Sequence, residues 1–468
     1  MAGVCETGNR ISSADGKRGE LEGVEVEGRM SRWLLLWRRV SAFPAVRQRA
    51  VRGLSPKAVC KVTRYLRYWS ACELRLRFFE RGAGETEKDA GEESKEFEGA
   101  RAGTGRLELG GLGASAANAN PTQGDLSKDV AIANPPEDSV ADLAFSPQSE
   151  HLAVASWDKK VRIYEIDGNG NSQGTAFFEF EGPVLNCAWS KDGSKVFGAS
   201  ADKTARMLDL GAGQTQPGQA VQVAAHDQPI RCCETIVVNG NQMLVTGGWD
   251  KMIKYWDLRS PTPAGQIEAK ERIYTMDVRN DMLVVGSADR WVHVINVNQP
   301  GQFYKIMQSP LKWQTRVISI FSPEPNGFAI GSIEGRCAIQ YVEDKDQTGN
   351  FSFKCHRQQA TNDRNLSNVF AVNAISFHPQ HGTFSTAGSD GTFHFWDKDA
   401  KHRLKGYPEV GGSIVATDFN RGGNIFAYAV GYDWSKGYQG NNAQYPNKVM
   451  LHPVMPDECK PRPKVGKR

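Results

Sequence analysis

The segment LVTGGWDKMIKYWDL, residues 244–258, decides the fold of this chain. An apolar run is followed by small residues, an acidic turn residue and an alternating run, which predicts two β-strands joined by a tight turn. The same order of residue types recurs at 152–166, 196–210, 283–297, 328–342, 384–398 and 426–437. Seven copies indicate a repeat protein whose units bury their apolar faces against one another.

One acidic residue marks the turn of each copy: Asp158, Asp202, Asp250, Asp289, Glu334, Asp390 and Asp433. Successive acids lie 44, 48, 39, 45, 56 and 43 residues apart, which brackets the ~40–45 residues of a WD40 blade. A further strand-like run precedes the hairpin, as in VLNCAWS (184–190) and VNAISFHP (372–379). The sequence therefore predicts an all-β fold, a seven-bladed WD40 β-propeller over residues 124–468.

The ring must also close. The first complete blade begins near Asp138, so the extended piece at residues 129–133 lies upstream of it, while the last blade otherwise ends with residues 448–452. We expect the first piece to supply the outer strand of the last blade. That pairing would remove two sheet edges that invite aggregation.

Residues 1–123 differ in composition from the rest of the chain. Residues 29–79 hold 13 Lys and Arg and one acid, Glu73, and an acidic block from Glu85 to Glu98 follows. Such a composition cannot bury enough apolar surface to order itself. We expect residues 1–123 to be a disordered leader and linker, or a stretch wrongly assigned to the protein. A basic RNA-binding arm and an organelle-targeting peptide remain alternatives.

The charge balance excludes nucleic-acid binding through bulk charge. Of the 57 Lys and Arg and 53 Asp and Glu, residues 129–468 hold 35 and 36, so any RNA contact must come from a local basic patch. Nine cysteines without a Cys-x-x-Cys pair favour a reducing compartment. No apolar run approaches the ~20 residues that span a bilayer, so we expect no membrane insertion.

His226, Thr246, Asp250 and Trp256 have the spacing of the hydrogen-bonded chain that braces a WD40 blade. A buried Asp needs such donors. Similar residue types form hydrolase triads, but these recur in degraded form in the other copies, as structural residues do. We also expect the predicted central channel to gather no acids, base or metal ligands beyond those that the repeat explains.

Enzyme signatures are absent from the sequence: it contains no Gly-x-Ser-x-Gly, P-loop or His-Glu-x-x-His motif. The pair Cys355-His356 lacks further ligands nearby in sequence, so we expect an ordinary surface or core pair rather than half of a metal site. The prediction is a protein that is not an enzyme, with no cofactor and no metal.

Basic and aromatic residues gather on two adjoining copies of the repeat. A solvated basic loop is one interpretation; a docking groove for a peptide or a single nucleic-acid strand is the other, because such grooves combine charge with aromatic rings. The residues are Arg336, Phe351, Phe353, Lys354, Arg357, Lys398, Lys401, Arg403 and Lys405.

Several segments resemble one family, the WD40 mRNA export factor of the nuclear pore (the Gle/Rae family). Generic WD40 proteins do not share FKCHR or YDWSKG, and the resemblance covers roughly residues 124–468. The matching segments include DGSKVFGASADKTARMLDL (192–210), WDKMIKYWDLRS (249–260), FSFKCHR (351–357), GSDGTFHFWDKDA (388–400) and GNIFAYAVGYDWSKG (423–437).

The resemblance implies a peptide site on the side of the ring. The family's site residues correspond to Arg336, Phe353, Trp396, Asp397 and Lys398. Its next two basic positions are present with exchanged types, as Lys401 and Arg403, which keeps charge but changes the geometry of hydrogen bonding. Together with Lys354, these residues form the predicted peptide- and RNA-binding set, with its aromatic members as anchors.

The resemblance also implies a function. It is that of a non-enzymatic adaptor for nuclear export of polyadenylated mRNA, which docks the GLEBS motif of an FG nucleoporin and contacts mRNA or single-stranded RNA. We expect a monomer within a heteromeric complex, located in the nucleus at the nuclear pore and nuclear envelope and shuttling to the cytoplasm. The alternative is a mitotic spindle-checkpoint WD40 adaptor that binds a related peptide; FKCHR and YDWSKG argue against it.

Overall fold

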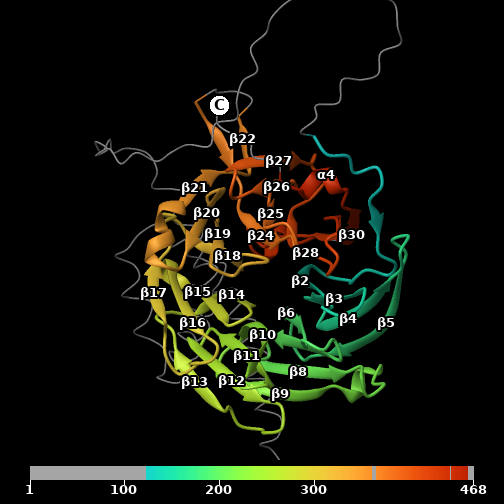
Figure 1. Ribbon diagram of the computed structural model, residues 1–468. Coiled ribbons are helices and arrows are strands. Elements are labelled where there is room, and N and C mark those ends of the chain that lie inside the picture. Colours follow the sequence, from blue (N-terminus) through green and yellow to red (C-terminus); the bar gives the residue numbers. More distant parts are fainter. Residues whose placement is uncertain (1–122, 361–364, 443, 462–468) are drawn as a thin grey trace, which may run out of the picture. The chain divides into compact units, whose positions relative to one another are not determined.

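The structure, a computed structural model, describes residues 123–360, 365–442 and 444–461 (Figure 1). Seven four-stranded antiparallel sheets surround a central axis, so the predicted seven-bladed β-propeller is confirmed. The leader predicted at residues 1–123 lies outside the described residues, except for Gln123. No helix in the described part of the chain is long and apolar enough to cross a membrane.

The first four blades use consecutive strands, counted from the channel outward. Blade one comprises β2 (Val140–Phe145), β3 (His151–Ser156), β4 (Lys160–Ile166) and β5 (Ser172–Glu179), and blade two comprises β6 (Val184–Trp189), β7 (Lys195–Ser200), β8 (Thr204–Asp209) and β9 (Val221–Ala225). Blade three comprises β10 (Ile230–Val238), β11 (Asn241–Gly248), β12 (Met252–Asp257) and β13 (Gly265–Glu268), and blade four comprises β14 (Ile273–Arg279), β15 (Met282–Ser287), β16 (Trp291–Asn296) and β17 (Lys305–Gln308).

The next two blades repeat this plan around one interruption. Blade five comprises β18 (Thr315–Ile320), β19 (Gly327–Ser332), β20 (Arg336–Tyr341) and β21 (Phe351–Lys354), and blade six comprises β24 (Val372–Phe377), β25 (Thr383–Gly388), β26 (Phe393–Asp397) and β27 (His402–Gly406). A two-stranded hairpin, β22 (Arg357–Gln359) with β23 (Ser367–Val369), lies between them in sequence. Short 3-10 turns occur at η2 (Pro217–Gln219), η3 (Ala288–Arg290) and η4 (Asp344–Gly349).

Blade seven is completed by the two ends of the repeat region. Its strands are β28 (Ile414–Phe419), β29 (Ile425–Val430), β30 (Lys448–Pro453) and β1 (Val130–Ala131), in that order. Val130 lies opposite Leu451 in the β1–β30 register. The predicted closing piece at residues 129–133 therefore occupies the expected place, although only two of its residues form a strand.

A buried network of charged side chains fastens this closure. His452, on β30, places its Nδ1 atom 2.6 Å from Asp129 Oδ1 and its Nε2 atom 3.3 Å from Glu458 Oε2, on the short helix α4 (Pro456–Cys459). Tyr428 donates its hydroxyl hydrogen to Asp129 Oδ2 at 2.6 Å. Burial alone disfavours the imidazolium, but the hydrogen bonds and charges of Asp129 and Glu458 raise the pKa of His452 to about 9.

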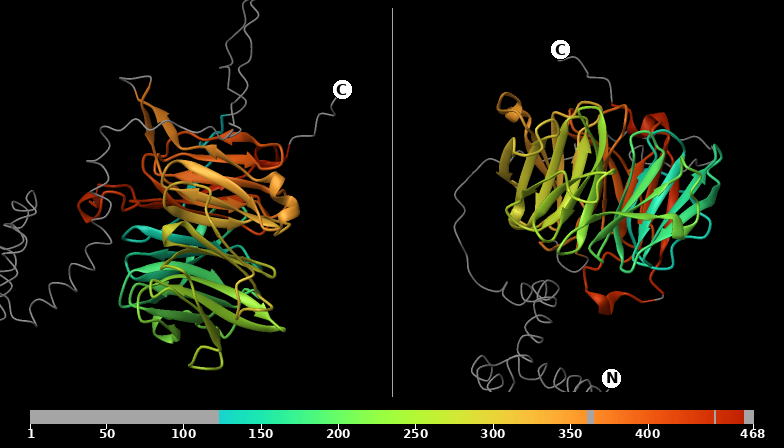
Figure 2. Two further views of the ribbon diagram at one scale, coloured as in Figure 1. Left: turned by 90° about the vertical axis from the view of Figure 1, so that its left-hand side faces the viewer. Right: turned by 90° about the horizontal axis from the view of Figure 1, so that it is seen from below.

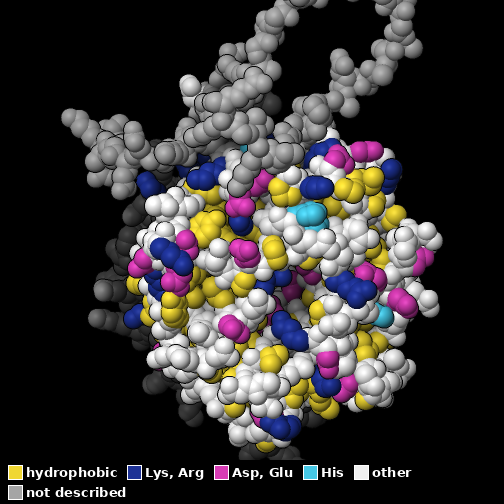
Figure 3. Space-filling model, viewed as in Figure 1, with side chains coloured by type: hydrophobic (Ala, Val, Ile, Leu, Met, Phe, Trp, Pro, Cys, Tyr) yellow, Lys and Arg dark blue, Asp and Glu magenta, His cyan; other side chains and the backbone are white. Residues whose placement is uncertain are grey.

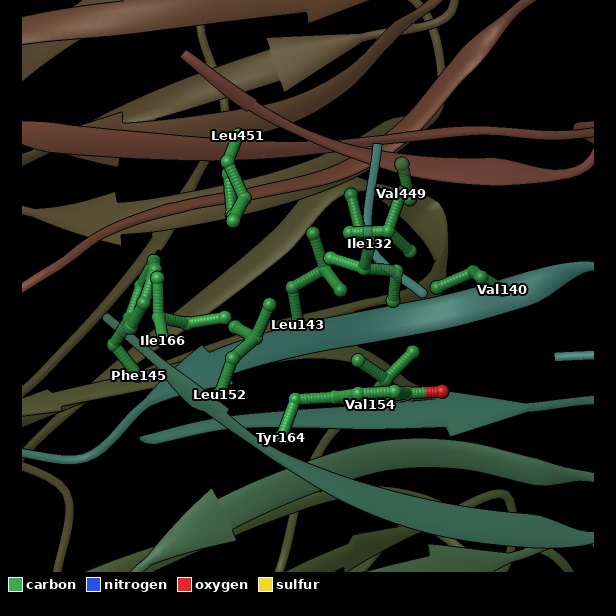
Figure 4. Packing of buried hydrophobic residues seen from close by; sticks show 13 residues of the cluster. Ile132, Val140, Leu143, Phe145, Leu152, Val154, Tyr164, Ile166, Val449 and Leu451 are labelled. Carbon is green, nitrogen blue, oxygen red and sulfur yellow. The ribbon is translucent and has the colours of Figure 1, made fainter. Parts of the chain in front are cut away.

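Apolar side chains fill the spaces between neighbouring blades, because each strand directs alternate residues to either face of its sheet. Figure 4 shows the seam between the last and first blades. Ile132, Val449 and Leu451 from the blade-seven side pack in one cluster with Leu143 and Val154 of blade one. The ring is thus closed by hydrophobic packing as well as by strand pairing.

Blade seven departs from the pattern predicted for its repeat. The second run expected directly after Asp433 is a long loop, residues 431–447, and the third strand starts only at Lys448. The loop contains η5 (Tyr438–Gly440) and projects from one face of the ring (Figure 2). Turns between second and third strands share that face with the connections between blades, since successive strands are antiparallel.

Candidate functional site

The predicted brace of blade three forms one chain of hydrogen bonds. His226 Nδ1 lies 2.9 Å from Asp250 Oδ2, and His226 Nε2 lies 2.7 Å from Thr246 Oγ1. Trp256 donates its indole N–H to the same Thr246 oxygen at 2.8 Å. Burial alone would raise the pKa of Asp250, but the hydrogen bond and charge of His226 lower it. These hydrogen bonds join the segment before β10 to strand β11, to the turn after β11 and to strand β12. The four side chains therefore have a structural role.

A second such chain, in blade six, was missed from the sequence. His356 Nδ1 lies 2.9 Å from Asp390 Oδ1, and its Nε2 lies 2.9 Å from Thr386 Oγ1, which accepts the indole N–H of Trp396 at 2.9 Å. Thr, Asp and Trp have the same spacing in both blades. His356 stands ten positions further upstream than its counterpart, because β22 and β23 are inserted after it.

Trp396 and Phe353, which were predicted to be aromatic anchors for a partner, are buried in the ring. Trp396 is only 7% exposed and Phe353 only 2%. Their ring centroids lie 4.6 Å apart, and both belong to the core cluster between blades five and six. A ring that is already buried gains little further burial on binding, so these residues support the surface above them.

Asp397 also has a structural role. It is buried, and its Oδ1 atom accepts the backbone N–H groups of Asp399 and Ala400 at 2.9 Å each. These bonds fix the turn between β26 and β27, which carries Lys398 and Lys401. An Asp that bonds backbone groups two and three positions later is a common turn-forming device.

The basic members of the predicted set lie on the two outer strands of blade five, on the outermost strand of blade six and in the turn that leads to it. Arg336, on β20, lies directly opposite Lys354, on β21. Lys401, in the turn after β26, lies 4.8 Å from the centroid of the Phe351 ring on β21, so the two edges meet. Arg403, on β27, is exposed and pairs in register with Trp396. We call Arg336, Lys354, Lys398, Lys401 and Arg403 the basic edge.

The charge of the basic edge is local. Lys398 is paired with Asp399 at 2.8 Å, and Arg336 lies 3.9 Å from Glu334. Lys401 and Arg403 form no ion pair with any residue that the structure describes. In Figure 3, basic and acidic side chains are interspersed over the face of the ring that is shown. The face shown in Figure 3 therefore presents mixed charge rather than one broad basic surface.

Exposed tryptophans mark a second surface, which the sequence did not identify. Trp249 is 39% exposed and Trp313 is 48% exposed, although tryptophan is usually well buried. Trp157 and Trp434 stack on each other with their centroids 4.2 Å apart. Trp157, Trp249 and Trp434 follow second strands, and Trp313 lies in a connection between blades, so all four belong to the same face. We call this the aromatic face.

The loop at residues 431–447 holds part of the aromatic face in place. Asp433 accepts a hydrogen bond from Ser389 of blade six, and its backbone oxygen accepts one from Arg316 of blade five at 3.2 Å. Trp434 has a left-handed backbone conformation, with φ of 59°, which is costly for a bulky side chain. The loop therefore ties blades five, six and seven together and presents Trp434 against Trp157 of blade one.

Comparison with known proteins places this chain in a family. The WD domain, G-beta repeat model matches residues 130–165, 174–209, 218–257 and 365–397. The mRNA export factor GLE2 of Chaetomium thermophilum is 64% identical over 361 residues, which cover 76% of this chain and 99% of that protein. The chain belongs to the mRNA export factor family of WD40 proteins.

Other members of the mRNA export factor family match over a similar extent. The Poly(A)+ RNA export protein of Schizosaccharomyces pombe is 56% identical over 74% of this chain and 96% of its own, and Protein Rae1 of Drosophila melanogaster is 46% identical over 71% and 96%. Among solved structures, that of U3-55K superposes with a TM-score of 0.58 over 70% of this chain and 98% of that one, at 14% identity. This last likeness shows the fold alone.

The central channel of this family member contains acids that the sequence analysis did not place there. The innermost strands surround a cavity of about 740 Å³ lined by Asp142, Glu234, Asp277 and Asp418, among others. Burial raises the pKa of Asp142 to about 6 and that of Asp418 to about 7. The sequence analysis expected no such groups beyond those that the repeat explains, and it did not predict the positions of these acids.

Three of these channel acids join neighbouring blades. Asp142 accepts the backbone N–H of Cys187 at 3.1 Å, Asp277 that of Ile320 at 2.6 Å, and Asp418 that of Phe145 at 2.8 Å. In each case the donor belongs to the next blade around the ring. Within the described ranges, no group of three or more His, Cys, Asp or Glu side chains is arranged to hold a metal ion.

Proposed function

We propose that this protein is a non-enzymatic adaptor that supports nuclear export of polyadenylated mRNA at the nuclear pore. The observation that carries the proposal is the extent of the similarity. The chain matches 99% of the length of the protein named mRNA export factor GLE2 at 64% identity, and 96% of the length of the protein named Poly(A)+ RNA export protein at 56% identity. The polar networks of the ring have structural explanations, which supports a docking role over a catalytic one.

The aromatic face is the surface that we propose for the GLEBS-type segment of an FG nucleoporin. Exposed tryptophans are the side chains that contribute most to binding at protein interfaces, because their burial removes a large apolar area from water. Trp249 and Trp313 are exposed in the free ring, unlike Phe353 and Trp396, and thus have area left to bury.

The basic edge is the surface that we propose for RNA. The outer parts of two adjoining blades present this charge over a layer of buried aromatic rings, through Arg336, Lys354, Lys398, Lys401 and Arg403. Phosphate contacts of this kind give affinity without sequence selectivity. We propose that the protein acts as a monomer that bridges RNA to a nucleoporin in a heteromeric complex, in the nucleus and at the nuclear envelope.

Purification of the tagged full-length chain from its own cells, followed by mass spectrometry, tests the assignment. An FG nucleoporin with a GLEBS motif should co-purify, and ribonuclease should not remove it because the contact is direct. Recovery of kinetochore proteins alone would favour the spindle-checkpoint alternative and overturn the proposal.

Surface plasmon resonance with a synthetic GLEBS-type segment tests the surface. Trp249→Ala combined with Trp313→Ala should weaken binding at least about tenfold, since a well-buried aromatic anchor contributes at least ~2 kcal/mol. Tyr304→Ala is the matched control, because Tyr304 is 56% exposed but lies beside β17, on the outer edge of blade four. Equal losses in both variants would reject the aromatic face.

A further inference from the structure

Two side chains of the aromatic face cover each other in the free ring. Trp157, in the turn after β3, and Trp434, in the loop after β29, stack with their centroids 4.2 Å apart and an angle of 23° between their planes. Both are only partly exposed, whereas Trp249 and Trp313 of the same face are 39% and 48% exposed. The stack therefore hides apolar area that a partner crossing this face could otherwise cover.

Trp434 is held in this stack at a cost in free energy. Its backbone has a φ of 59°, in the left-handed region that disfavours a bulky side chain. Its indole N–H is buried and meets no acceptor among the residues that the structure describes, and a buried donor without an acceptor is destabilising. Rotation of the ring away from Trp157 would let this N–H meet water. An open state of the pair therefore removes a cost that the stacked state carries.

The backbone on either side of Trp434 is fixed independently of the stack. Asp433 accepts a hydrogen bond from Ser389 of blade six, and its Oδ1 atom accepts the backbone N–H of Ser435 at 3.0 Å. Gly437 donates its N–H to the carbonyl oxygen of Trp434 at 3.0 Å. The indole can therefore turn about its side-chain bonds while this part of the loop keeps its place.

We propose that Trp157 and Trp434 form a latch, which is stacked in the free ring and is opened by the docking segment of the nucleoporin. In the open state the segment packs an apolar side chain on Trp157, and the indole N–H of Trp434 is hydrated. The identity of the segment rests on the proposed function; the latch itself does not. Because the segment binds only the open state, it shifts the population toward that state.

Fluorine NMR of the full-length chain labelled with fluorotryptophan tests the latch without a partner. Trp157→Phe, Trp434→Gly and Trp249→Phe assign the three resonances. Those of Trp157 and Trp434 should broaden through exchange between stacked and open states on the microsecond-to-millisecond timescale. Trp249, which lies outside the stack, is the internal control and should stay sharp. If the two latch resonances show no exchange in the free protein and do not move when a GLEBS-type segment binds, the proposal is overturned.

Surface plasmon resonance with a synthetic GLEBS-type segment tests the opening through two substitutions with opposite effects. Trp434→Gly uncovers Trp157, and glycine adopts a positive φ without strain. The segment should then bind about three- to tenfold more tightly, since the apparent affinity is limited by the fraction of open protein. Trp157→Ala removes the ring on which the segment packs and should weaken binding about tenfold. Tyr438→Ala is the control in the same loop, because Tyr438 is 63% exposed and lies outside the stack.

The outcomes separate the latch from the proposed function. Thermal melts first establish that each variant is folded. If no form of the protein binds the segment while the exchange of Trp157 and Trp434 persists, the assignment of the aromatic face fails and the latch stands. If oligoadenylate opens the stack and the segment does not, the occupant is RNA and the proposal is wrong. If Trp434→Gly weakens binding as Trp157→Ala does, the closed pair is itself a docking surface and no latch opens.

Discussion

The indole of Trp396 donates its N–H to Thr386 inside blade six, while its ring lies 4.6 Å from the ring of Phe353 in blade five. The Trp396 side chain thus completes the brace of blade six and also packs against the neighbouring blade five. The basic edge rests on this layer, so the position of Lys398 and Lys401 depends on Trp396 without the indole itself being available to a partner.

Trp396→Ala should therefore destabilise the ring. Truncation of a buried Trp typically costs about 3–5 kcal/mol, and the loss should appear as a large fall in the denaturant midpoint. Trp396→Phe keeps most of the packing and removes the donor, so it should cost less. If Trp396→Ala were as stable as the parent protein and lost only partner binding, the sequence-based prediction of an anchor would be right after all.

The two braces should respond alike to the loss of their acids. Asp250→Ala and Asp390→Ala each leave a buried histidine without its partner, which costs about 1–3 kcal/mol. Both variants should melt at lower temperature and, once folded, bind a GLEBS-type segment and RNA as the parent does. A variant of full stability that cannot bind either partner would contradict the structural role.

The sequence was sufficient for the blades because their signals are local. A turn acid such as Asp250 lies between two alternating runs in one short window, and the repetition of that window predicts the ring. The closing strand could also be predicted from the sequence. Residues 129–133 precede the first complete blade, so this extended piece has no partner strand within that blade.

Other features depend on contacts that no short window contains. The hydrogen bond from Phe145 to Asp418 joins residues 273 positions apart, and nothing in either segment distinguishes a channel acid from a surface acid. The brace of blade six was hidden because a hairpin separates His356 from Thr386. Trp396 has the same neighbours in sequence whether its ring is buried or exposed, so its role could be decided only by packing.

Removal of residues 124–136 should destabilise the ring and reduce its solubility. The deletion takes away β1, the buried carboxylate of Asp129 and Ile132 of the seam cluster, and it exposes the edge of β30. Deletion of residues 1–122 alone is the control and should leave the melting temperature nearly unchanged. Equal melting temperatures for both deletions would show that the closure contributes nothing.

The stability of the closure should depend on pH through His452. Its pKa rises from about 6.5 in the unfolded chain to about 9 in the folded ring. The stabilisation is therefore fully present below pH 6.5 and is lost as pH rises towards 9, by up to about 3 kcal/mol. His452→Gln should flatten the fall in unfolding free energy between pH 7 and 9.5. An unchanged slope in this variant would exclude His452 as the source.

Charge reversal on the basic edge should separate RNA binding from peptide binding. Lys401→Glu with Arg403→Glu would remove two of the proposed phosphate contacts, and each contact to a single strand contributes about 0.7 to the slope of log affinity against log salt. The slope should thus fall by about 1.4, with a loss of at least about tenfold in oligoadenylate affinity at low salt. Affinity for a GLEBS-type segment should change little, because we propose the aromatic face for that contact.

Lys159→Glu with Lys203→Glu is the matched control for that experiment. Both lysines are exposed, and they occupy turns of blades one and two, so the pair changes the net charge equally at a distance from the basic edge. Because exposed charges more than about 10 Å apart are largely screened at 0.1 M salt, the control should keep both the slope and the affinity. If the two double variants lose RNA affinity to the same degree, net charge attracts RNA to the ring as a whole and the basic edge is not a site.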